Sequence, residues 1–74
     1  MFRFVVLTEK VRGFDTFEEA RSFALGTVPA VVCERIATAT GSRLEEVARH
    51  DLLFDPAEGE ARPQFVSLMP RPPA

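Results

Sequence analysis

Two apolar-rich segments near the ends of the chain have the length and composition of β-strands, in which successive side chains point to opposite faces. Residues 2–8 place Phe2, Phe4 and Val6 on one side and the intervening residues on the other. Residues 64–69 place Phe65, Ser67 and Met69 on one side and Val66 and Leu68 on the other. The pattern therefore predicts short strands over 2–8 and 64–69.

A short helix is predicted over residues 16–25. Asp15 or Thr16 can act as its N-cap, with a glutamate three residues later to complete a capping box. Gly26 follows, and glycine commonly ends helices. Apolar residues in this segment recur at helical spacing, and they are Phe17, Ala20, Phe23 and Ala24.

Residues 29–36 are rich in β-branched side chains, which favours a strand. Both faces of this strand are apolar at its N-terminal end, and charged residues occur only near its C-terminal end. A strand that is apolar on both faces suits the centre of a sheet.

Residues 43–51 are open to two interpretations. Residues 42–45 have the Ser-x-x-Glu spacing of a second capping box. Residues 40–42 can instead form a hairpin turn that pairs a strand at 43–50 with residues 32–39. Two adjacent glutamates and an alanine favour a helix, so we expect a helix. Its apolar face would hold Leu44, Val47, Ala48 and Leu52.

These elements define an α+β fold with a three-stranded sheet and one or two short helices on one face, in the order β-α-β-α-β. A chain of 74 residues has room for one core, so we expect a single domain over 1–69. Residues 70–74 are expected to form a proline-rich disordered tail. The predicted core residues are Phe4, Val6, Phe17, Ala20, Phe23, Val32 and Val47.

The net charge of −2 argues against a general affinity for nucleic acid or anionic membranes. The longest apolar run is far shorter than the roughly 20 residues that span a bilayer. Met1 leads directly into a strand, so no export signal is expected. A single cysteine without an export signal indicates a reducing cytoplasm.

Cys33 and His50 are the only residues that resemble a nucleophile and its base. Cys33 lies among valines in a predicted strand, where a thiol usually packs as a small apolar side chain. His50 lies near the end of the predicted second helix, where it would interact with the helix dipole. We therefore expect no catalytic residue, and no metal or cofactor site.

Adjacent carboxylates occur at Glu18–Glu19 and Glu45–Glu46. Such pairs can support acid–base chemistry or bind a divalent ion, but both lie in first turns of predicted helices, where negative charge stabilises the helix. The arginines are interleaved with these acids, as expected of a solvated face. The isolated glycines form no phosphate-binding pattern.

The sequence thus favours a small cytoplasmic protein-interaction module that binds a larger protein or assembly as an inhibitor or accessory protein, without catalysis. The alternative is a nucleic-acid-associated accessory protein that uses its eight arginines. We also expect a C2 homodimer through an edge strand, either 2–8 or 64–69, because a short chain with open sheet edges gains by covering them.

Overall fold

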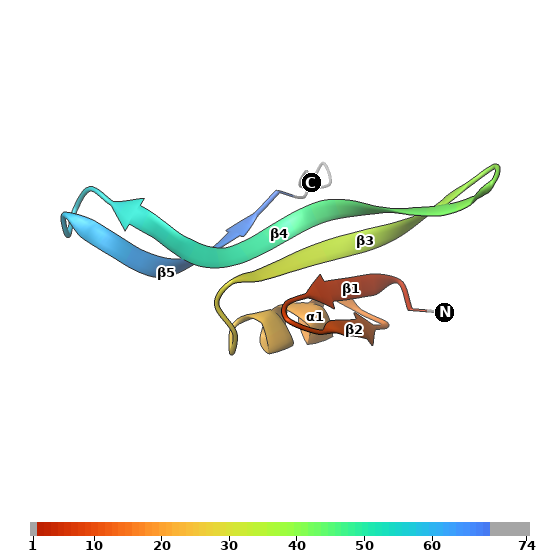
Figure 1. The fold of residues 1–74 in the computed structure, drawn as a ribbon, viewed down its shortest axis with the longest axis horizontal. Helices are drawn as coiled ribbons and strands as arrows, with labels where there is room; N and C mark the ends of the chain where they lie inside the picture. Colours follow the sequence, from red (N-terminus) through yellow and green to blue (C-terminus); the bar gives the residue numbers. More distant parts are fainter. Residues whose placement is uncertain (1, 69–74) are drawn as a thin grey trace, which may run out of the picture.

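A five-stranded antiparallel sheet is the main element of the computed structural model, which describes residues 2–68 (Figure 1). The strands lie in the order β2-β1-β3-β4-β5. One helix, α1 (Phe17–Ala24), connects β2 to β3. The strand bounds are β1 Phe4–Leu7, β2 Val11–Phe14, β3 Ala30–Thr38, β4 Gly41–Asp55 and β5 Glu60–Ser67.

The predicted three-stranded sheet with up to two helices is therefore wrong. Residues 43–51 lie within the long strand β4, as the hairpin interpretation had it, and not in a helix. Pairing with β3 overrides the local helix preference of Glu45 and Glu46, and pairing with β5 extends the strand from Ala48 onward. Residues 11–14, for which no separate strand was predicted, form β2. The predicted tail at 70–74 lies outside the described residues.

The predicted helix is confirmed, with bounds one residue shorter at each end. Thr16 is its N-cap, and the Thr16 hydroxyl accepts a hydrogen bond from the Glu19 N–H at 3.2 Å. The same hydroxyl donates to the Glu19 carboxylate at 3.0 Å. These contacts satisfy a helix N–H that has no partner within the helix itself.

The core lies between α1 and one face of the sheet. Ala20 and Ala24 are fully buried, and their small side chains let the helix approach the strands closely. The core cluster comprises Phe4, Val6, Ala20, Ala24, Ala30, Val32, Val47 and Ala48. Five of the seven predicted core residues are buried, while Phe17 and Phe23 are partly buried against the cluster.

A β-bulge in β4 changes which side chains face the helix. Val32 pairs with Ala48, but the next β3 residue, Cys33, pairs with Glu46, so Val47 has no partner on β3. Because of this extra residue, the even-numbered side chains of β4 point away from α1 before the bulge, as at Glu46, and toward α1 after it, as at Ala48. His50 consequently points toward α1.

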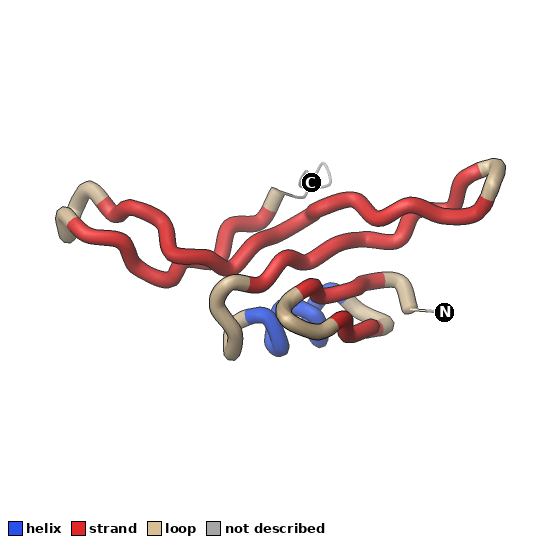
Figure 2. Tube along the Cα trace, in the orientation of Figure 1, coloured by secondary structure: helices blue, strands red, loops and turns tan. Residues whose placement is uncertain are grey.

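The two long hairpins extend past α1 at opposite ends of the molecule (Figure 2). The β3–β4 hairpin runs to one end, and the β4–β5 hairpin to the other. The resulting shape is long and flat, with extents of 46 × 34 × 20 Å. Large parts of both hairpins therefore lie outside the layer that the helix covers.

The sheet has edges at β2 and β5, whereas β1 lies inside it between β2 and β3. The expectation that 2–8 is an edge strand is therefore wrong. On β5, the Leu68 N–H just beyond the strand donates to Val47 O at 2.7 Å. Because N–H groups alternate in direction along a strand, the nitrogen of Pro63 faces outward, where its missing N–H breaks no bond to β4.

Candidate functional site

Cys33 and His50 lie on opposite faces of the sheet. Val32 faces the helix, so the next residue, Cys33, faces away from it. The bulge places His50 on the helix face instead. The structure therefore brings no thiol–imidazole pair together.

His50 is a buried link between β4 and the C-terminal end of α1. Its Nδ1 lies 2.8 Å from Ala24 O and 2.9 Å from Thr27 O. Both partners are acceptors, so Nδ1 carries a proton and donates to them. The prediction that His50 interacts with the dipole of its own helix is wrong, because it lies in a strand; it caps carbonyls at the end of α1.

Burial raises the pKa of the Cys33 thiol from its ordinary value of 9.0, and the Glu46 carboxylate on the neighbouring strand raises it further. A thiol that stays protonated at neutral pH is a poor nucleophile. These observations support a packing role for Cys33.

We expect Cys33→Ala to remain folded, with a loss in unfolding free energy of about 1 kcal/mol. The unfolded thiol ionises at a lower pH than the buried one. Unfolding of the wild type should therefore become easier as pH rises through 9.0, and Cys33→Ala should lack this dependence. Urea titrations between pH 7 and 10 measure both effects. Rapid labelling of folded wild type by a thiol reagent at pH 7 would contradict the packing role.

The two carboxylate pairs have separate structural partners. Glu19 belongs to the N-terminal cap of α1, whereas Glu45 and Glu46 lie on opposite faces of β4. Glu45 pairs with Arg43 at 3.4 Å, and Glu46 pairs with Arg49 at 2.9 Å. The expected first-turn role of Glu45 and Glu46 is wrong, since no helix forms there. Within residues 2–68, no three His, Cys, Asp or Glu side chains are placed to hold a metal ion.

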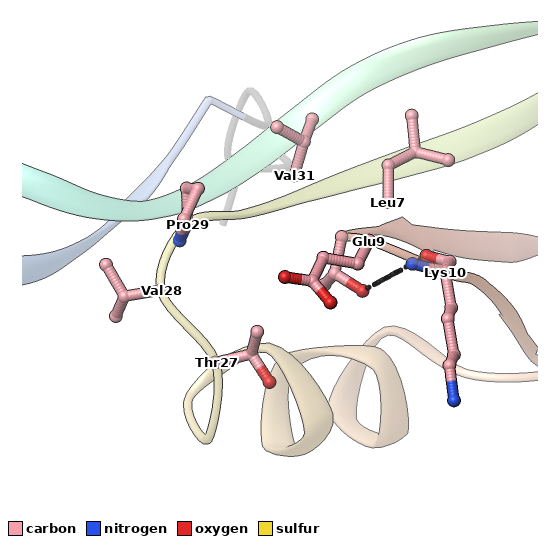
Figure 3. A pocket seen from close by; sticks show the side chains of 8 residues that line it. Leu7, Glu9, Lys10, Thr27, Val28, Pro29 and Val31 are labelled. Atoms are coloured by element: carbon pink, nitrogen blue, oxygen red, sulfur yellow. Dashed lines mark hydrogen bonds between the residues drawn. The ribbon is translucent and has the colours of Figure 1, made fainter.

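The larger hollow lies between the β1–β2 turn and the loop from α1 to β3 (Figure 3). Thr8 Oγ1 accepts a hydrogen bond from the Lys10 N–H at 3.1 Å, and the Lys10 ammonium points away from the Glu9 carboxylate. No nucleophile and base meet there. Its volume is about 540 Å³, and it is lined by Leu7, Thr8, Glu9, Lys10, Thr27, Val28, Pro29 and Val31.

A smaller hollow of about 430 Å³ holds two arginines near the β3–β4 hairpin. Arg35 donates to Phe2 O at 3.0 Å and to Ser42 Oγ at 3.3 Å. Arg3 pairs with Glu34 at 3.1 Å. Both guanidinium groups thus have partners within the chain.

The β4–β5 hairpin carries an amphipathic surface that we call the arm, residues 51–64. Cross-strand partners share a face, and Leu52 pairs with Pro63 while Phe54 pairs with Ala61. These four residues form the apolar face of the arm. Leu52 is 57% exposed and Phe54 is 66% exposed, so this face lies open.

The opposite face of the arm is polar and acidic. Asp51 pairs with Gln64, and Asp55 pairs with Glu60. Between them, Leu53 pairs with Arg62. We call this the acidic face of the arm.

The arm was not among the elements predicted from the sequence, although the sequence carries a signal for it. From Asp51 to Asp55, acidic and apolar residues alternate at the period of a strand, except at Leu53. Leu52 also fitted the helical spacing of the preceding segment, and that coincidence concealed the alternation.

No protein-family model, no curated protein and no solved structure matches the chain. Among residues 2–68 the only helix is α1, which is far too short to cross a bilayer. The geometry of the arm is therefore the basis for a functional proposal.

Proposed function

We propose that this protein acts by binding another protein through the apolar face of the arm, as an accessory protein or inhibitor without catalysis. The observation that carries the proposal is the exposure of Leu52 and Phe54 on one face of a hairpin that extends past the helix. Large apolar side chains gathered on a protruding surface mark interaction sites more often than scattered ones do.

Burial of these side chains supplies a driving force for association. Transferring a leucine or phenylalanine side chain out of water contributes about 1.5–3 kcal/mol. The β4–β5 pairing already fixes the backbone of the arm, which lowers the entropy lost on binding.

Affinity capture from the native host tests the proposal, with wild type compared against Leu52→Ser/Phe54→Ser. We expect the double variant to lose its captured partner by at least about tenfold, as for central apolar anchors of an interface. Partner amounts would be measured by quantitative mass spectrometry.

Val11→Ser is the matched control, because Val11 is 70% exposed but lies on β2 at the other edge of the sheet. It should capture the partner as wild type does. Equal capture by all three proteins, with the double variant folded by circular dichroism, would overturn the proposal.

A further inference from the structure

The arm concentrates the negative charge of the molecule. It holds Asp51, Asp55, Glu58 and Glu60 against a single arginine, Arg62, for a net charge of −3. The whole chain carries −2, so the remaining residues carry a net charge of +1. The excess acidity is therefore confined to the same hairpin that presents the apolar face.

Like charges face one another directly on the arm. Asp55 and Glu60 are cross-strand partners, an arrangement that destabilises a strand pair. Within residues 2–68, neither forms an ion pair, because Arg62 lies 3.6 Å from Glu58 instead.

A second like-charge pair in the sheet shows the contrast. Glu34 and Glu45 are also cross-strand partners. Each has an arginine: Arg3 lies 3.1 Å from Glu34, and Arg43 lies 3.4 Å from Glu45. Internal cations thus compensate this pair, whereas the carboxylates of Asp55 and Glu60 remain available to an external cation.

From this charge distribution we infer that the partner of the arm is an amphipathic protein segment whose apolar side chains are flanked by lysine or arginine. Its apolar side chains cover Leu52 and Phe54. Its cations reach around the end of the arm to Asp55 and Glu60, which lie on the acidic face and form the last cross-strand pair before the turn. The inference rests on the proposed function and adds the chemistry of the partner. Complementary charge selects partners and speeds their encounter.

The test uses two synthetic helix-forming peptides of equal length, one of leucine and lysine and one of leucine and glutamate. Each is titrated into the ¹⁵N-labelled full chain, and amide chemical shifts are recorded. We expect the lysine peptide to shift amides of residues 51–64, the glutamate peptide to leave them unchanged, and 0.5 M salt to weaken binding.

The variant Asp55→Asn/Glu60→Gln should weaken binding of the lysine peptide by about fivefold. Both substitutions keep an acceptor oxygen, including Asp55 Oδ1, which accepts from the Ala57 N–H at 3.0 Å. The matched control, Glu18→Gln/Glu19→Gln, removes two charges from α1 and should stay within about twofold of wild type.

Three results would overturn the inference. Equal shifts of the arm with both peptides would mean that the apolar face binds without charge selection, which leaves the proposed function standing. Equal weakening by both double variants would mean that only net charge matters. Arm shifts that depend on protein concentration without peptide would identify a second copy as the occupant.

Discussion

Replacing His50 with leucine is expected to lower the free energy of unfolding by about 2–4 kcal/mol. The leucine fills space but leaves Ala24 O and Thr27 O without their donor. Those carbonyls lie where α1 ends and the chain turns toward β3, so the loss of their donor loosens the packing of α1 on the sheet. For a chain of this size, the thermal midpoint should fall by about 10 °C or more. Urea and thermal unfolding measure the change.

His50→Asn is the control, because the asparagine amide nitrogen can occupy nearly the position of Nδ1 and donate in its place. It should recover about half of the lost stability. If leucine and asparagine variants match wild type, the two carbonyls do not depend on His50.

Removing the arm is expected to abolish partner binding while leaving the protein folded. Residues 52–63 would be replaced by Asn-Gly, which joins Asp51 to Gln64. These residues are cross-strand partners, and a two-residue Asn-Gly turn suits such a junction. The core cluster contains no residue of the arm, so the thermal midpoint should stay within about 8 °C of wild type.

The matched control shortens only the tip, replacing residues 56–59 with Asn-Gly and keeping both faces of the arm. It should bind as wild type does, both in host capture and with the lysine peptide. A truncated chain that still captures the partner would place the binding site elsewhere. A truncated chain that unfolds would show that the arm is part of the stable fold.

Local signals were sufficient to predict α1 and the centre of β3. The cap at Thr16, the alanines of the buried face and the β-branched run after Pro29 each act over a few residues. Interactions distant in sequence decide the rest. Glu45 and Glu46 favour a helix locally, but pairing with β3 and β5 holds β4 extended.

The bulge at Val47 also limits what the pattern can show. Simple alternation along β4 from Leu44 predicts the wrong face for His50. The extra residue of the bulge becomes apparent only from the pairing with β3. Similarly, the apolar face of the arm requires the register that sets Leu52 opposite Pro63. The sequence shows the apolar residues of the candidate site, but which of them share a face depends on the pairing of β4 with β5.

Pro63 determines how another chain can approach the outer edge of β5. Its nitrogen faces outward without a hydrogen, so an added strand would lose a rung in the middle of its ladder. Proline at this position disfavours pairing of the β5 edge with a strand of another chain, including the strand stacking found in amyloid. If the arm binds a partner as proposed, the missing donor favours contacts through the side chains of Leu52 and Phe54 over backbone pairing along this edge.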